Sequence, residues 1–266
     1  MPSSYVSETE LPGRCIDLDT LEIIAHRYSW ASSLVRGKEV LEVGCGPGLG
    51  LGCLSRHAKR VIGGDVTEES IMLAKKHYGR RVELAHLDAH RMPFKDHSID
   101  TVICLATIIY MDLPIFLEEC RRVLKSGGTL AMNTPNKDQP GFEGSLLSRA
   151  YFSVPEFHSL LQQSGFESEF FGAFPIRHNG PASRSLPVSR PDILSFRKWA
   201  GKTLRLLGLY GTISRLHHRQ TRRIMLTEEL KQKDINLVEG VQVAPISCSA
   251  PNREHRIIYV TAQARS

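Results

Sequence analysis

A glycine-rich loop directly after a short apolar run is the feature that most constrains how this chain can fold. Residues 39–43 (EVLEV) predict a buried strand, because a short apolar run that ends at glycines is typical of one. The loop that follows, GCGPGLG, contains four glycines and precedes a predicted helix over residues 49–57. Glycine lets a backbone approach a ligand closely, and a helix N-terminus offers free N–H donors. The segment therefore predicts a strand, a ligand-binding loop and a helix in succession.

Strands and helices are expected to alternate along most of the chain. Six further strands are predicted at residues 60–65, 82–87, 99–104, 129–133, 167–171 and 257–263, and helices at 21–35, 68–78, 113–124 and 154–164. Asp19 and Thr20 are expected to cap the first helix, and Gly127 and Gly128 to end the one over 113–124. This order predicts an α/β, doubly wound, Rossmann-like fold with seven strands in a sheet covered on both faces.

Basic residues gather in one stretch near the end of the chain. The net charge is +6, yet residues 176–223 alone hold eleven Arg and Lys against a single acid, Asp192. We expect a core of residues 1–175 and 255–266, interrupted by a mostly helical insertion or cover segment, 176–254, on the substrate side. Its basic helix could be a solvated cover, contact an anionic membrane surface through residues 192–208, attract an anionic acceptor or face nucleic acid.

Composition and cysteine spacing bear on the compartment. The chain is 41% hydrophobic and 23% charged, which is ordinary for a globular protein and excludes wholesale disorder. It has no apolar run long enough to span a bilayer and no signal-like N-terminus. Its six cysteines form no CxxC pair, so we expect free thiols and neither structural zinc nor another metal. A soluble, cytoplasmic protein is expected.

The glycine spacing bears on which ligand the loop accepts. Dinucleotide sites need GxGxxG, and the three possible registers instead place Leu49, Leu51 or Cys53 at the last position. Glu42 at the strand end would repel a pyrophosphate. S-adenosylmethionine carries a sulfonium, an ammonium group and a carboxylate but no phosphate, so it suits the loop better. Asp65 and Asp88, at the ends of the next two strands, could accept bonds from ribose hydroxyls and an adenine amino group.

Five ordered segments resemble the successive motifs of class I methyltransferases, in particular the small-molecule branch that includes the ubiquinone and menaquinone biosynthesis methyltransferases. These segments are residues 40–48, Asp65, 87–94, 98–104 and 121–128. The resemblance implies S-adenosylmethionine as cofactor. It also implies that the methionine side is lined by Glu42, Gly44, Cys45 and Gly46. By the same resemblance, Asp65 and Val66 hold the ribose, and Asp88 and Ala89 flank the adenine. Leu105 is implied to contact the amino-acid end of the cofactor, and Tyr28 to belong to a helix closing over the cofactor.

The resemblance implies methyl transfer to a small molecule. O-methylation is favoured, N- and C-methylation stay open, and acceptor positioning is expected to be the main catalytic device. Tyr110 and His158 are the candidate catalytic groups, and His90 is interpreted as cofactor packing. The stretch after residue 104 lacks the Asn/Asp-Pro-Pro-aromatic motif of amino-methylating nucleic-acid enzymes, which argues against such a substrate. The alternatives are a nicotinamide-dependent oxidoreductase and a non-catalytic cofactor-binding partner protein. The sequence does not indicate the acceptor or the oligomeric state.

Overall fold

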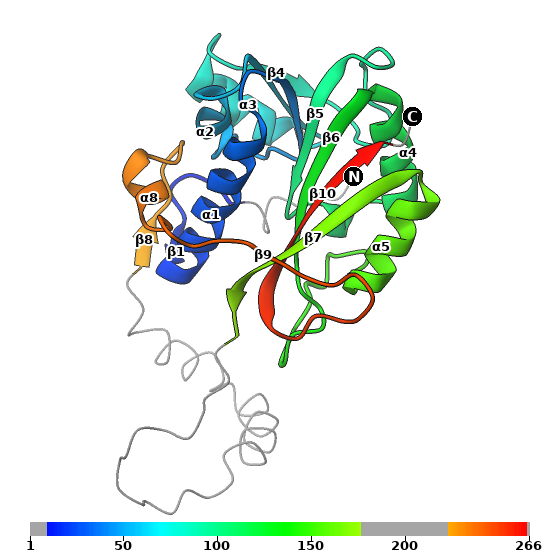
Figure 1. Ribbon diagram of the computed structural model, residues 1–266. Coiled ribbons are helices and arrows are strands. Elements are labelled where there is room, and N and C mark those ends of the chain that lie inside the picture. Colours follow the sequence, from blue (N-terminus) through cyan, green and yellow to red (C-terminus); the bar gives the residue numbers. More distant parts are fainter. Residues whose placement is uncertain (1–9, 177–222, 265–266) are drawn as a thin grey trace, which may run out of the picture. The chain divides into compact units, whose positions relative to one another are not determined.

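The computed structural model describes residues 10–176 and 223–264, and their centre is one eight-stranded sheet (Figure 1). The strand order is β4-β3-β2-β5-β6-β10-β7-β9. The bounds are β2 Glu39–Val43, β3 Arg60–Asp65, β4 Glu83–His86, β5 Ile99–Leu105, β6 Leu124–Pro135, β7 Phe166–Pro175, β9 Ala244–Pro245 and β10 His255–Ala264. The eighth strand is the two-residue β9, which the sequence pattern did not predict because it is too short to show a period.

The directions of the strands confirm the doubly wound fold and show that β10 runs antiparallel to its neighbours. The pairs β2–β3, β2–β5, β3–β4 and β5–β6 are parallel. β10 lies between β6 and β7 and is antiparallel to both, as the red strand in Figure 1 shows. The carboxyl ends of β2, β3, β4 and β5 therefore meet at one edge of the sheet, where open α/β folds bind ligands.

Helices cover both faces, and side chains alternate between the two faces along each strand. Leu41 and Val43 belong to the core cluster that includes α4 (Leu113–Val123) and α5 (Val154–Gln163), whereas Val40 belongs to the cluster on the opposite face. That second cluster packs α1 (Leu18–Leu34), α2 (Leu51–Ser55) and α3 (Glu68–Tyr78). A short 3-10 turn, η2 (Ile108–Tyr110), follows β5.

Several element boundaries differ from prediction, and the start of the first helix has a clear local reason. α1 begins at Leu18, earlier than expected, because the carboxylate of Asp17 accepts the Thr20 N–H at 2.7 Å and is the N-cap instead of Asp19. The helix α4 ends at Val123, and β6 starts at once, so Gly127 and Gly128 lie inside that strand. α2 is shorter than predicted, ending at Ser55.

Residues 224–254, which belong to the expected cover segment, contribute to the same core. The stretches on either side of the undescribed residues form one compact unit. Leu226, Leu230 and Val238 are buried, β8 (Arg223–Met225) pairs with β1 (Cys15–Asp17), and α8 (Gln232–Asn236) follows. The predicted basic helix and the membrane contact through 192–208 lie outside the described residues.

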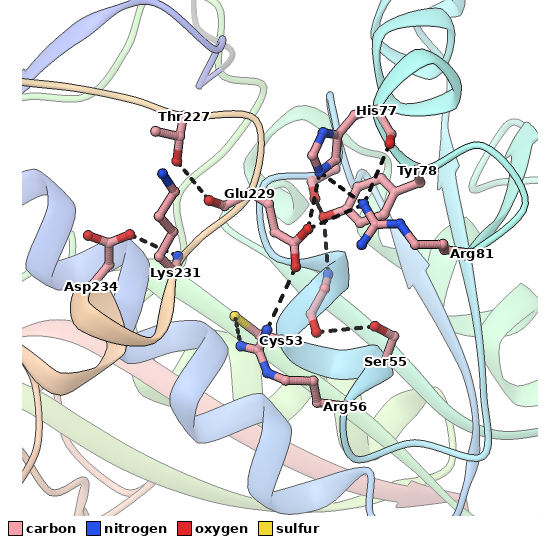
Figure 2. Close-up of polar contacts among 12 residues, drawn as sticks. Cys53, Ser55, Arg56, His77, Tyr78, Arg81, Thr227, Glu229, Lys231 and Asp234 are labelled. Atoms are coloured by element: carbon pink, nitrogen blue, oxygen red, sulfur yellow. Dashed lines mark hydrogen bonds and ion pairs between the residues drawn. The ribbon is translucent and has the colours of Figure 1, made fainter.

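Residues 226–231 form a strap across the helices that follow the glycine loop. The Leu230 N–H donates to the Leu49 carbonyl at 2.8 Å. Figure 2 shows Glu229 reaching toward α2 and α3, where its carboxylate lies 3.1 Å from His77 Nε2, 3.6 Å from Arg81 and 3.7 Å from Arg56. One backbone hydrogen bond and one cluster of charges therefore hold the strap against the glycine loop, α2 and α3. In the described ranges no helix is both long and apolar enough to cross a membrane.

Candidate cofactor and acceptor site

One cavity of about 560 Å³ opens at the carboxyl edge of the parallel strands. Its volume lies in the ordinary range for small-molecule sites, roughly 300–1,000 Å³. Residues that follow β2, β3, β4 and β5 line it, together with residues from α1 and from the loop after β6. Ten of the twelve residues predicted from the sequence lie on its wall: Tyr28, Gly44, Cys45, Gly46, Asp65, Val66, Asp88, Ala89, Leu105 and Tyr110.

The glycine loop turns sharply because of its backbone conformation. Gly44 has φ +73°, and a Cβ built there would lie 2.4 Å from the Thr107 side chain. The N–H groups of Gly44 and Cys45 both donate to the Gly64 carbonyl, at 2.7 and 3.0 Å. The loop is thus fixed to β3 on one side and pressed against Thr107 on the other. Only glycine fits at position 44.

Asp65 joins the end of β3 to the glycine loop. Its Oδ2 accepts the Gly46 N–H at 2.9 Å, and its Oδ1 accepts the Thr67 N–H at 2.8 Å. Each carboxylate oxygen can accept more than one hydrogen bond. The two backbone bonds therefore fix the carboxylate orientation while leaving acceptor capacity for a pair of ligand hydroxyls.

Asp88 and Ala89 line the cavity at the next strand end. Oδ1 of Asp88 accepts both the backbone N–H of His90, at 2.9 Å, and its ring Nδ1–H, at 2.8 Å. The backbone bond, followed by the ring bond, lowers the pKa of the Asp88 carboxyl, so it is ionised at neutral pH. Among the described residues, side chains and amides donate to only Oδ1 of this carboxylate, which leaves Oδ2 for a ligand.

Glu42 departs from the expectation that it lines the methionine side. It is 1% exposed and lies beneath the loop, where Tyr28 donates its hydroxyl to Oε1 at 2.8 Å. Burial raises the pKa of Glu42 to about 7, and its Oε2 has no partner within the described chain. The reason is the strand register: Glu42 points to the face covered by α1, whereas the cavity starts at the backbone turn after Val43.

The structure places the two candidate catalytic residues in different parts of the fold. Tyr110 lies on the cavity wall in η2. His158 does not: it lies in α5, where Nδ1 is 3.1 Å from Ser168 Oγ and the ring packs edge-on against Phe170. His158 is therefore a packing histidine, and the prediction that placed it near the chemistry is wrong. The helical pattern of α5 could not show that this side chain packs against β7.

Arg27 is a site residue that sequence reasoning missed. It is 6% exposed, pairs with Glu10 and lines the cavity, and its Nε has no partner among the described groups. A buried guanidinium needs a counter-charge, which Glu10 supplies, and as a cation on the cavity wall Arg27 also suits a ligand carboxylate. The available signal was a lone arginine on the otherwise apolar face of α1 that includes Ile24 and Tyr28.

Further residues beyond the predicted set come from the loops after β5 and β6. They supply a mixed apolar and polar wall that includes Ile109, Met111, Glu143, Ser145, Arg149 and Tyr151. The phenol oxygen of Tyr151 accepts the Ser145 N–H and the Ser148 hydroxyl, each at 2.9 Å. No group of three or more His, Cys, Asp or Glu residues gathers in the described ranges in a way that could hold a metal.

The donor and acceptor set fits S-adenosylmethionine. Two oriented carboxylates, Asp65 and Asp88, suit ribose hydroxyls and an adenine amino group, and the buried Arg27 suits a carboxylate. The only cations on the described wall are Arg27 and Arg149, whereas Glu10 and Glu143 add further negative charge. That balance suits a ligand with positive groups better than one with a pyrophosphate.

A mostly parallel, doubly wound sheet with a glycine loop and acidic strand ends defines the nucleoside-cofactor class of α/β domains. Comparison with known proteins narrows the class. Residues 41–132 match the family described as "Methyltransferase domain", and S-adenosylmethionine is the cofactor that this match supports. The resemblance found in the sequence motifs is confirmed.

Similar proteins support the same class. The chain is 34% identical over 171 residues to a Mycolicibacterium smegmatis protein named "Probable S-adenosylmethionine-dependent methyltransferase", covering 59% of this chain and 63% of that one. It is 26% identical to a "Ubiquinone biosynthesis O-methyltransferase" of Roseobacter denitrificans, covering 59% and 70%. A methyltransferase structure from Aquifex aeolicus shares the fold, with 24% identity, TM-score 0.53 and coverage of 65% and 93%. The chain spans 63% and 48% of the first two curated relatives.

Proposed function

We propose that the protein transfers the methyl group of S-adenosylmethionine to a small-molecule acceptor. The observation that carries this proposal is a single cavity whose wall combines Asp65, Asp88 and the buried, incompletely paired Arg27. These three groups match the ribose hydroxyls, the adenine amino group and the carboxylate of the cofactor. The printed name of the Roseobacter relative favours oxygen as the atom methylated.

The cofactor would supply an activated methyl group with its leaving group built in, so the chain's task is to bind and align. Arg27 would hold the carboxylate, Asp65 the ribose and Asp88 the adenine amino group. The wall formed by Tyr110, Met111 and Tyr151 would receive the acceptor. Orientation of two reactants in one site can supply several kcal/mol, up to roughly 7–11 in the best intramolecular cases.

On the part of the cavity wall that the structure describes, no histidine is available as a base. His90 is the only histidine on the described part of the wall, and both of its ring nitrogens are engaged, Nδ1 by Asp88 and Nε2 by the Asp112 N–H at 3.0 Å. We therefore propose that positioning is the main catalytic device. The Arg149 guanidinium on the same wall is the group that would favour an anionic acceptor. The six cysteines are free thiols, which supports a reducing, cytoplasmic compartment.

Calorimetric titration with S-adenosylhomocysteine and NADH tests the cofactor assignment. Binding of S-adenosylhomocysteine alone is expected, and binding of NADH alone would instead support the oxidoreductase alternative. Methylthioadenosine, which lacks the amino-acid group, makes the test specific to Arg27. In Arg27→Met, affinity for S-adenosylhomocysteine should fall by at least about tenfold, while affinity for methylthioadenosine stays within about twofold.

Turnover is tested by S-adenosylhomocysteine formation with a panel of phenolic, carboxylic and amine acceptors. Product with a phenol or carboxylate would support O-methylation. A protein that binds the cofactor tightly and turns over none of the panel would favour the non-catalytic partner alternative. In the binding test, an equal loss of affinity for S-adenosylhomocysteine and for methylthioadenosine in Arg27→Met would contradict the assignment of Arg27 to the carboxylate.

A further inference from the structure

His90 lies between two parts of the cavity wall that come from different strands. Its Nδ1–H donates to Asp88 Oδ1 at 2.8 Å, at the end of the wall proposed to bind adenine. Its Nε2 accepts the backbone N–H of Asp112 at 3.0 Å, in the turn that follows η2. Because Nδ1 faces a carboxylate and Nε2 faces an N–H, Nδ1 is the donor of the ring and Nε2 is its acceptor.

The contacts continue from Asp112 to the loop after β6. The Asp112 carboxylate pairs with the Arg149 guanidinium at 3.4 Å. The backbone N–H of Arg149 donates to the Ile109 carbonyl at 2.8 Å, and the next N–H, that of Ala150, reaches the same oxygen at 3.4 Å. The same loop holds Tyr151 in place through Ser145 and Ser148. Every step from Asp88 to Tyr151 is therefore a hydrogen bond, an ion pair or a short stretch of backbone.

We propose that His90 is a positioning residue that couples cofactor binding at Asp88 to the order of residues 143–151, the loop that contributes Tyr151 to the acceptor wall. This inference rests on the proposed function, because it requires the cofactor to contact Asp88. It assigns His90 a task different from cofactor packing and different from base catalysis.

The order of these contacts sets the direction of the coupling, which runs from Asp88 through His90 to Asp112. The His90 bonds occupy Oδ1 of Asp88, so a ligand amino group would bind Oδ2 and fix the carboxylate plane. A fixed carboxylate restricts the imidazole ring, and a restricted ring holds the Asp112 N–H. Side chains of Asp88 and Arg149 are 51% and 58% exposed, so each contact alone is weak in water. A bound cofactor covers this wall and lowers the local dielectric, which strengthens the chain of contacts when the cofactor is present.

The coupling implies an order of binding. Cofactor bound at Asp88 would order the loop after β6, and the acceptor would then bind a wall already formed. By reciprocity, an acceptor that orders the wall would tighten cofactor binding by the same factor. The order of the acceptor wall then depends on whether the methyl donor is bound.

Hydrogen exchange on the full chain tests the proposal without knowledge of the acceptor. The probe is S-adenosylhomocysteine at saturation, and the readout is the exchange rate of a peptide covering residues 143–153. In the parent protein the ligand should slow exchange there by at least about fivefold. His90→Asn keeps a donor near the Nδ1 position, so the Asp88 bond can persist, but it is too short to meet the Asp112 N–H.

The expected result for His90→Asn is cofactor affinity within about threefold of the parent and less than about twofold ligand-induced slowing over residues 143–153. Asp112→Asn, which weakens the Arg149 pair and leaves the His90 bond, should lose part of the slowing. His158→Asn is the matched control outside the cavity and should behave like the parent. A purely structural role for His90 would lower stability and affinity together and would leave the ligand-induced slowing intact.

Full slowing in His90→Asn, with ligand bound, would overturn the proposal, because it would mean that the ligand orders residues 143–153 by direct contact. No slowing in the parent despite tight binding would overturn it as well. Failure of the parent to bind S-adenosylhomocysteine would instead refute the proposed function, and the calorimetric titration identifies that case. Should His90→Asn not fold, Asp112→Asn decides: unchanged slowing there rejects the coupling.

Discussion

Glu42 is a buried carboxyl whose ionisation should set how stability depends on pH. Burial raises its pKa from 4.5 to about 7, and Asp65 adds repulsion, while the Tyr28 hydrogen bond and Arg27 act in the opposite sense. The folded protein therefore keeps this proton at pH values where the unfolded chain has lost it. The contribution favours folding below pH 4.5 and is lost progressively as the pH rises toward 7.

The size of the effect follows from the shift. About 2.5 pKa units, at about 1.36 kcal/mol per unit, give a cost of about 3 kcal/mol above pH 7. Glu42→Gln keeps the shape and an acceptor for Tyr28 but cannot ionise. Relative to the parent, this variant should gain about 2–3 kcal/mol in free energy of unfolding between pH 5 and pH 8.

Urea unfolding at pH 5 and pH 8, at one ionic strength, measures this gain. Glu39→Gln is the matched control, because Glu39 lies on the same strand but is partly exposed and pairs with Lys59 at 3.2 Å. The control should change little between the two pH values. If Glu42→Gln and the parent lose stability in parallel from pH 5 to pH 8, the carboxyl is not desolvated as described and the reasoning fails.

Three further predictions concern the loop and the strap. Asp65→Ala should weaken S-adenosylhomocysteine binding by at least about tenfold in calorimetry, because it removes the acceptor that orients the loop, whereas the exposed Glu68→Ala should not. Gly44→Ala should cost about 1–3 kcal/mol more than Gly37→Ala in urea unfolding. Both glycines have positive φ, but only position 44 meets another side chain, so equal costs would contradict the packing argument. Glu229→Ala should lose about 1 kcal/mol of stability through its charge cluster, with the neighbouring, exposed Glu228→Ala as the control that stays unchanged.

Local sequence signals predicted the sheet and most of the wall of the cavity. The strand before the glycine loop, the helix over 68–78 and the carboxylates at two strand ends all depend on short-range patterns, and the structure reproduces them. These signals work because parallel strands bring their carboxyl ends to one edge whatever the connecting segments contain. Asp65 and Asp88 could therefore be placed from spacing alone.

Long-range contacts account for what the sequence did not predict. Arg27 is a site residue because α1 lies beside the glycine loop, and Glu42 is buried because Tyr28 of the same helix covers it. The role proposed for His90 depends on Asp112, which is 22 residues away. No periodicity connects such partners, since each contact forms only after two separate elements have packed. His158 shows the converse: its position after β6 was suggestive, but the helix presents it to Ser168.

The place of β10 in the sheet has a consequence for the biosynthesis of the chain. β10 lies between β6 and β7, yet residues 176–254 separate it in sequence from β7. A ribosome therefore completes β6 and β7 well before the strand that joins them exists, and until then the backbone N–H and C=O groups along their facing edges lack their strand partner. Pairing across so long a separation is slow and leaves intermediates prone to aggregation. We expect the nascent chain to depend on chaperones during that interval, and loss of β10 to be far more damaging than its ten residues suggest.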